Sequence, residues 1–368
     1  MINRFLQMIA VFALATGMCH AADLIKNDSP QQKALLKQLK GVKDKIVYES
    51  YRDNNWELMA INADGSHPKN LTNTPDINES YPQCSPDGKM IAFECCDNTT
   101  GAQYRIEVMN ADGTGRRKVV DNARQMAWSP DCTRLAFETP IPGKPVTINE
   151  GLKIYDMKTG KTTVWTDGKD TIRLIDPSGK ETTPKASELK NLLNLTWSAD
   201  GKWVLGTIVV TFGWGQSIVA IEVDGDRVID ILHMDEGVTG NILGCRPNVS
   251  PDGKSITWAV ADKNKLMWID IAPVDFSAAI PKVGEHKHMV KDIVPVELYH
   301  PDWSPDNQFV AFSRGVRGNR MRPAYYVPGQ KAPGWDICVF DRDTPDVFVQ
   351  LTHDSLSNKE PDWLKVSE

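Results

Sequence analysis

The sequence predicts an all-β fold: a six-bladed β-propeller, closed by strand exchange between the two termini and preceded by a short helix. Two observations predict it. A turn motif of the Trp-Ser-Pro-Asp-Gly type recurs five times along the 368 residues, and an incomplete sixth copy lies near the carboxyl end. Each complete copy leads into an apolar strand, and the copies recur at intervals of about 40 to 70 residues, which is typical of propeller blades with insertions.

The five complete copies share a serine that precedes a Pro-Asp or Ala-Asp pair. They are Cys84-Ser85-Pro86-Asp87-Gly88, Trp128-Ser129-Pro130-Asp131-Cys132, Trp197-Ser198-Ala199-Asp200-Gly201, Val249-Ser250-Pro251-Asp252-Gly253 and Trp303-Ser304-Pro305-Asp306-Asn307. Proline presets φ, aspartate bonds nearby backbone N–H groups and glycine accepts a positive φ, so the motif predicts a tight turn between two strands. An Asn-Ala-Asp-Gly turn at residues 62–65 and 110–113 predicts the hairpin between the third and fourth strands.

Each end of the chain lacks part of a blade. The first unit has strands at residues 45–50 and 56–61 but no motif turn before them, and Asp362-Trp363 has no strands after it. If the terminal strand completes the first blade, six blades close without an exposed edge. Before the ring, Ser29-Pro30 followed by residues 31–40 predicts a short, capped amphipathic helix.

The amino terminus predicts export. Arg4 precedes an apolar run from Phe5 to Met18, and small residues follow at the expected cleavage point, which is the pattern of a secretory signal peptide. The run is too short to span a bilayer. We therefore expect a signal peptide at 1–21, a helical extension at 22–42 and the propeller at 43–368, in a periplasmic or secreted protein that does not span the membrane.

The composition excludes several classes of protein. The chain has 42 Lys and Arg against 48 Asp and Glu, a formal net charge of −6, and 41% hydrophobic residues. Such a hydrophobic content excludes a disordered chain. An acidic chain has no overall attraction for phosphate backbones, so nucleic acid is not an expected partner. Six cysteines follow the signal peptide, and their spacing leaves open whether they form disulfides.

The repeats resemble those of the TolB-like six-bladed β-propellers, which carry the same two turn signatures and close by strand exchange between the termini. The resemblance covers roughly residues 43–363. It implies a periplasmic propeller that binds a protein or another ligand of the cell envelope. TolB proteins have an additional α/β domain before the propeller, for which residues 22–42 leave no room, so the resemblance concerns the propeller alone.

Strand parity separates the connections into two faces. The motif turns and the Ala-Asp-Gly turns share one face, here called the motif face. The longest insertions, at residues 139–151, 166–190, 281–298 and 314–335, are expected on the opposite face, here called the loop face. Long loops on a rigid scaffold often carry binding sites, so the loop-face mouth of the central channel is the expected site.

The innermost strands are expected to place polar side chains around that mouth. These side chains lie four or two residues before the motif serine or its counterpart Leu364, and they combine a cation, an imidazole and carboxylates, as a ligand pocket requires. A basic, aromatic part of the 314–335 insertion would suit carboxylates or sugars. The expected ligand-binding residues are Tyr81, Arg246, His300, Asp302, Glu360, Asp362, Arg322, Tyr325 and Tyr326.

Four histidines are candidate ligands of a divalent metal: His286, His288, His300 and His353. In an extended segment, His286 and His288 point to the same side. Imidazole nitrogens suit divalent transition metals. No cofactor is otherwise expected.

Two functions fit these features. The favoured one is a non-enzymatic propeller that binds a protein or a cell-envelope or carbohydrate ligand at the loop-rich channel mouth. The alternative is a carbohydrate-active enzyme similar to oligogalacturonate lyases, which use this repeat with a metal held by histidine. Uronate elimination needs a cation, with Arg246 or the metal as candidate, and a base, with His300, Lys287 or Tyr81 as candidates.

Overall fold

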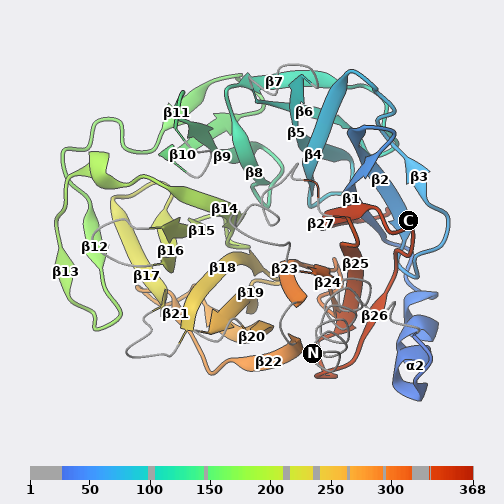
Figure 1. The fold of residues 1–368 in the computed structure, drawn as a ribbon. Coiled ribbons are helices and arrows are strands. Elements are labelled where there is room, and N and C mark those ends of the chain that lie inside the picture. Colours follow the sequence, from blue (N-terminus) through green and yellow to red (C-terminus); the bar gives the residue numbers. More distant parts are fainter. Residues whose placement is uncertain are drawn as a thin grey trace, which may run out of the picture.

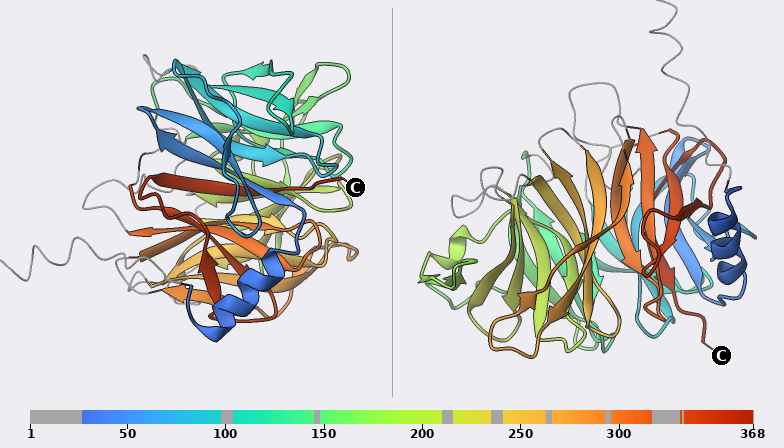
Figure 2. Two further views of the ribbon diagram at one scale, coloured as in Figure 1. Left: turned by 90° about the vertical axis from the view of Figure 1, so that its right-hand side faces the viewer. Right: turned by 90° about the horizontal axis from the view of Figure 1, so that it is seen from below.

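Six sheets surround a central axis in the computed structural model (Figure 1). The structure describes residues 27–97, 104–144, 148–209, 216–234, 241–262, 266–292, 296–316, 331 and 333–367. In the side views of Figure 2 the strands run between the two faces of a flat ring, and the helix at residues 30–39 lies outside it. The predicted six-bladed propeller is confirmed.

Four of the blades follow the chain in simple order, each beginning with its innermost strand. Blade 2 contains β4 (Ile77–Cys84), β5 (Met90–Asp97), β6 (Arg105–Asn110) and β7 (Arg117–Asp121). Blade 3 contains β8 (Arg124–Trp128), β9 (Arg134–Pro140), β10 (Asn149–Asp156) and β11 (Thr162–Val164). Blade 5 contains β18 (Asn241–Val249), β19 (Ser255–Asp262), β20 (Met267–Asp275), β21 (Lys282–Val283) and β22 (Lys287–Asp292). Blade 6 contains β23 (Val296–Trp303), β24 (Phe309–Val316), β25 (Asp336–Asp341) and β26 (Phe348–Gln350).

Blade 4 is widened by the insertion at residues 166–190, which was expected on the loop face. The blade itself contains β14 (Leu192–Trp197), β15 (Trp203–Val209), β16 (Gln216–Glu222) and β17 (Arg227–Met234). The insertion contains β12 (Arg173–Ile175), β13 (Glu181–Thr182) and the 3₁₀ helix η1 (Ala186–Glu188). β12 pairs in parallel with β17, so this segment extends the outer edge of the blade (Figure 1). Ile172 and Leu174 are buried there, and their burial explains why the segment stays on the edge.

The insertion at residues 281–298 also differs from the expected loop. Residues 287–292 form β22, the outer strand of blade 5, which pairs with β20. His286 and His288 therefore lie at the perimeter of the ring.

Blade 1 is built from both ends of the chain, as the sequence predicts. β27 (Ser357–Leu364) is its innermost strand, followed outward by β1 (Lys45–Arg52), β2 (Asn55–Asn62) and β3 (Lys69–Asn70). β27 pairs antiparallel with β1, Trp363 opposite Ile46, and all eight residues of β27 are buried. The terminal strand thus closes the ring.

The predicted helix is present as α2 (Pro30–Leu39). Ser29 Oγ accepts from the backbone N–H of Gln32, and the Gln32 side chain accepts from the backbone N–H of Ser29, which completes a capping box. Leu35 and Leu39 are buried with apolar residues of blades 1 and 6. The helix therefore covers the outer side of the seam where the ring closes.

The motif turns have the predicted geometry. In all five complete copies the serine hydroxyl donates to the aspartate Oδ1 over 2.5 to 2.7 Å. The residue after each aspartate has a φ between 59° and 71°. Glycine holds this position in three copies, whereas Cys132 and Asn307 accept the left-handed conformation in the other two.

All six cysteines after the expected signal peptide are free thiols. Cys95, Cys245 and Cys338 are buried, and burial raises the pKa of the Cys245 thiol to about 12. The expected signal peptide at 1–21 lies outside the described residues. Within the described ranges, no helix has the length and hydropathy needed to cross a membrane.

Removing β27 should unfold the protein. A chain that ends at Leu356 loses eight buried residues and exposes the edge of β1. Burial of Trp363 and Leu364 alone contributes about 4–8 kcal/mol, which is comparable with the whole stability of a domain. We expect aggregation or a loss of cooperative thermal unfolding measured by circular dichroism. A chain that ends at Val366 is the control, and a melting temperature within about two degrees of it would contradict closure by β27.

Candidate functional site

Each inner strand contains one residue in the left-handed region, four positions before the motif serine or Leu364. The six residues have φ values between 47° and 58° and are Tyr81, Gln125, Asn194, Arg246, His300 and Glu360. At each of them the pairing with the second strand shifts, as in a β-bulge. Non-glycine residues rarely adopt this conformation, and a bulge re-aims the side chain. This explains how side chains of unrelated chemistry, those of Tyr81, Asn194, Arg246, His300 and Glu360, reach one axial cavity.

The bulges also join neighbouring blades. The backbone N–H of Tyr81 donates to Glu49 Oε2 over 3.1 Å, and that of Glu360 donates to Ser313 Oγ over 3.1 Å. In both cases the acceptor belongs to the second strand of the preceding blade. The buried Glu49 also lies 3.2 Å from Lys359 Nζ. The backbone of the channel wall is therefore fixed from outside the channel.

Three of the predicted site residues meet inside the channel. Arg246 Nη1 lies 2.9 Å from Glu360 Oε2, and His300 Nε2 lies 2.9 Å from Glu360 Oε1. His300 Nδ1 is 2.9 Å from Ser313 Oγ. The three residues are only 4 to 6% exposed. The predicted convergence is therefore present, but these side chains bond to one another and lie within the channel instead of around an open mouth.

The space beside this cluster is small. The cavity that Tyr81, Arg246, His300 and Glu360 line has a volume of about 40 Å³. That is room for about one water molecule. Burial raises the pKa of Glu360 to about 7, while the Arg246 cation opposes this rise. The cluster is thus suited to tying blades 1, 5 and 6 together, and among the described residues the space beside it is too small for a sugar or a peptide.

Two of the three candidate bases for uronate elimination, Tyr81 and Lys287, are poorly placed in the structure. Burial raises the pKa of the Tyr81 phenol, so at neutral pH it keeps its proton. Lys287 lies on β22, at the perimeter of the ring, and is exposed. A general base works best with a pKa near the working pH and within reach of the substrate. Neither residue meets both conditions.

A larger cavity lies on the axis at the motif face. Its volume is about 330 Å³, and residues of all six blades line it. Its apolar walls are Trp128, Trp197, Trp303, Trp363 and the prolines of the turns, and its polar residues include Gln83, Thr196, Asn248, Asp302 and Asp362. Pro86 and Pro251 at its rim are exposed. Asp302 and Asp362 were expected at the loop-face mouth. They line this cavity instead, because each lies two residues after the bulge and therefore closer to the motif turns.

The tryptophans of this cavity are held by a repeated hydrogen bond. Each of three indole N–H groups donates to a backbone carbonyl two residues before the motif serine of the preceding blade. The bonds are Trp128 to Gln83 at 2.9 Å, Trp197 to Ala127 at 3.1 Å and Trp303 to Asn248 at 3.2 Å. The cavity walls are therefore rigid.

Asp302 and Asp362 receive only neutral donors among the described residues. Asp302 accepts from Asn248 Nδ2 at 2.7 Å and from the Trp363 N–H at 2.9 Å. Asp362 accepts from the Cys84 N–H at 2.8 Å and from Gln83 Nε2 at 2.9 Å. Burial raises the pKa of Asp302 to about 7, and burial together with the charge of Asp302 raises the pKa of Asp362. The pair would be stabilised by a cation.

The four candidate metal histidines do not meet at one place. His300 lies in the channel, and His353 follows β26 with its Nδ1 3.4 Å from Gln350 Nε2. His286 and His288 lie instead beside Asp270 of β20. The sequence did not identify Asp270 as a candidate metal ligand. Asp270 occupies the position in the third strand of blade 5 that Glu107 has in blade 2. Arg322, Tyr325 and Tyr326 lie outside the described residues, and their role stays a prediction.

Comparisons with known proteins support the fold. No protein-family model matches the chain, and no curated protein matches it. TolB from Acinetobacter baumannii superposes with a TM-score of 0.57 at 18% identity, over 90% of this chain and 70% of that one. A TolB structure from Agrobacterium tumefaciens gives 0.53 at 15% identity, over 86% and 91% of the two chains. The chain therefore has the TolB-like six-bladed propeller fold.

An oligogalacturonate lyase from Vibrio parahaemolyticus superposes less well. Its TM-score is 0.45 at 14% identity, over 84% of this chain and 75% of that one. A likeness at this level carries no argument about activity.

The Arg246–Glu360 pair should contribute to stability in a pH-dependent way. Because burial raises the pKa of Glu360 to about 7, its ionised form needs the Arg246 cation above that pH. We expect Arg246→Met to lower the free energy of unfolding by about 3–5 kcal/mol at pH 8.5. At pH 6, where Glu360 is protonated, the loss should be smaller by about 1 kcal/mol or more. Urea unfolding at both pH values measures the difference.

The matched control is Arg173→Met. Arg173 pairs with Glu181 at the surface, over 2.8 Å, so its removal should cost about 0–1 kcal/mol at either pH. An equal loss for Arg246→Met at pH 6 and pH 8.5 would show that the pair is not the source of its effect.

Proposed function

We propose that this chain is an exported, non-enzymatic binding protein that takes a basic side chain of a protein partner into the motif-face cavity. The observation that carries the proposal is the pair Asp302 and Asp362, which lies on an axial cavity of about 330 Å³ and accepts only from neutral donors among the described residues. The export signal expected at residues 1–21 supports a periplasmic or secreted location.

The chemistry of the cavity favours a lysine or arginine side chain. Its volume lies at the lower end of the range of ligand pockets, about 300–1,000 Å³. The apolar stem of a long basic side chain can lie against tryptophan and proline, while its charged end meets a carboxylate. A cation between Asp302 and Asp362 would also relieve their repulsion. A uronate, whose carboxylate would meet these two acidic groups, fits poorly.

The rim favours a protein as the source of that side chain. Five complete motif turns and β27 surround the cavity, and proline occurs in four of those turns. The turns are stiff because proline fixes φ and the serine hydroxyl bonds the aspartate. A rigid rim loses little conformational entropy when it binds a partner.

Small amides of single residues test this proposal. We expect Nα-acetyl-lysine amide and Nα-acetyl-arginine amide to change the intrinsic tryptophan fluorescence, and Nα-acetyl-norleucine amide to bind far more weakly. Asp302→Asn and Asp362→Asn should each reduce the affinity by about 10- to 100-fold, the range of a charged hydrogen bond. Asp167→Asn, at an exposed carboxylate outside the cavity, is the matched control.

Binding of these cations should strengthen as the pH rises. Because burial raises the pKa of Asp302 to about 7, a rise from pH 6 to pH 8 increases its ionised fraction about tenfold. Fluorescence titrations at the two pH values measure the change. Equal affinity at both values, or equal binding of the norleucine amide, would remove the acidic pair from the proposal.

The proposal also predicts no lyase activity. Incubation of the purified chain with pectic fragments, with and without added divalent metal, should give no increase in the absorbance of unsaturated uronates. Reproducible formation of that product, abolished by His300→Ala, would replace the binding function with the lyase alternative.

A further inference from the structure

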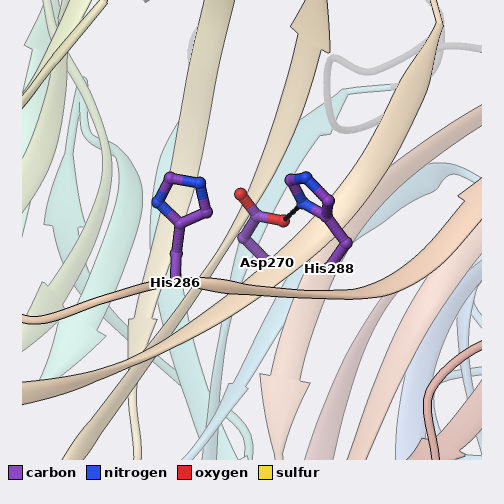
Figure 3. A group of neighbouring side chains, drawn as sticks. All are labelled: Asp270, His286 and His288. Atoms are coloured by element: carbon purple, nitrogen blue, oxygen red, sulfur yellow. Dashed lines mark hydrogen bonds and ion pairs between the residues drawn. The ribbon is translucent and has the colours of Figure 1, made fainter.

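We infer that Asp270, His286 and His288 form a zinc-binding site at the perimeter of blade 5. The three side chains offer ligand atoms that all lie within 4.8 Å of one another. Figure 3 shows the Asp270 carboxylate between the two imidazole rings. This site is separate from both axial cavities, and none of its residues belongs to the proposed binding function.

The local fold brings the three residues together. Asp270 lies on β20, and His288 is its direct partner on β22, where the register shifts between Ile269 and Asp270. His286 lies two residues before His288, so that in an extended chain both rings project from the same face. Their ring centroids are 5.6 Å apart. A strand pair with a bulge thus produces a three-residue cluster from a short sequence.

The carboxylate is the fixed member of the group. Asp270 is 1% exposed, and one of its oxygens lies 2.5 Å from His288 Nδ1. The Thr257 hydroxyl donates to the backbone carbonyl of Asp270 over 2.8 Å. Preorganised ligands of this kind lower the cost of binding an ion, because fewer side chains must be ordered at that moment.

Two tryptophans support the histidines. The ring of Trp268 lies edge-on to His288 at 5.2 Å, and that of Trp258 lies edge-on to His286 at 6.1 Å. The tryptophans form an apolar wall behind the histidines, which are themselves exposed. An ion would therefore be held against the blade on one side and keep a coordination position for water on the other.

The donor set selects zinc over harder cations. Two imidazole nitrogens and one carboxylate form a common three-ligand set for Zn²⁺, whereas Ca²⁺ and Mg²⁺ prefer oxygen ligands alone. Ligand atoms around a tetrahedral zinc lie about 3.4 Å apart, since each bond is about 2.0–2.2 Å long. The separation of up to 4.8 Å is thus closed by a movement of about 1.4 Å, which the exposed His286 can make.

Binding should tie the outer strand of blade 5 to the strand inside it. His286 and His288 stand at the start of β22, whereas Asp270 lies in the middle of β20. An ion that contacts all three adds a cross-link between these strands. Zinc should then raise the melting temperature of the whole chain, because a ligand that binds only the folded state stabilises it.

The experiment uses the full chain without a polyhistidine tag, freed of metal with a chelator that is then removed. Zinc chloride is titrated by calorimetry and by thermal unfolding. We expect one zinc ion per chain and a rise in the melting temperature at saturation. Co²⁺, bound in place of zinc, should give the visible absorption of a site with nitrogen and oxygen ligands.

Variants identify the ligands. His286→Ala and His288→Ala should each weaken zinc binding at least about tenfold and abolish the thermal shift. His286 is exposed, so that its variant should keep the fold, which circular dichroism verifies. Asp270→Asn should weaken binding in the same way. His353→Ala and His67→Ala, which alter histidines elsewhere on the ring, are the matched controls and should bind as the unaltered chain does.

Three results would overturn the inference. They are the absence of stoichiometric zinc binding to the unaltered chain, unchanged binding by the folded His286→Ala variant, and an equal loss of binding by the His353→Ala or His67→Ala controls. In the last case the zinc would lie at the control histidine or at the free thiols, and the Asp270 group would be a hydrogen-bonded pair between strands.

Discussion

The bulge four residues before each motif turn is the constraint on which the rest of the ring depends. It holds six non-glycine residues in the left-handed region, at φ values of 47° to 58°. Isolated, such a conformation costs about 1 kcal/mol or more per residue. The cost is offset because the released backbone N–H reaches an acceptor on the neighbouring blade, as from Tyr81 to Glu49 and from Arg246 to Thr207. Each bulge therefore both bends an inner strand and joins two blades.

The same constraint determines which part of the channel can accept a ligand. At the bulges Tyr81, Asn194, Arg246, His300 and Glu360 line one small axial cavity, and Arg246 and His300 both pair with Glu360 beside it. Two residues further on, the strands diverge toward the motif turns, and a cavity of about 330 Å³ remains. The carboxylates there, Asp302 and Asp362, repel each other and are bonded to neutral groups among the described residues. In the proposed function, paired charges occupy the first level, and the like charges of Asp302 and Asp362 make the second level receptive to a cation.

Much of this could be predicted from the sequence because the repeat has a fixed internal geometry. The offset from the motif serine placed Arg246, His300 and Glu360 on one ring, and the missing strand of the first unit placed β27 beside β1. The face that carries the proposed site could not be predicted in this way. It depends on whether Arg246 meets Glu360 across 114 positions of the chain, which no local pattern encodes. The place of the insertion at 166–190 could not be predicted for a similar reason, since β12 pairs with the distant edge strand β17.

The contact between blades 3 and 4 shows that the bulge forms even where a different residue accepts the hydrogen bond from its backbone N–H. Glu138 has the position on β9 that Glu94 has on β5, where Glu94 accepts from the bulge N–H of Gln125. The bulge N–H of Asn194 instead donates to Gln125 Oε1 over 2.8 Å. Within the described residues neither oxygen of Glu138 has a hydrogen-bond partner, and burial raises its pKa to about 8. The backbone conformation at Asn194 is nevertheless the same, so closure of six strands around one axis imposes the bulge, and each blade satisfies its N–H with whichever acceptor lies nearest.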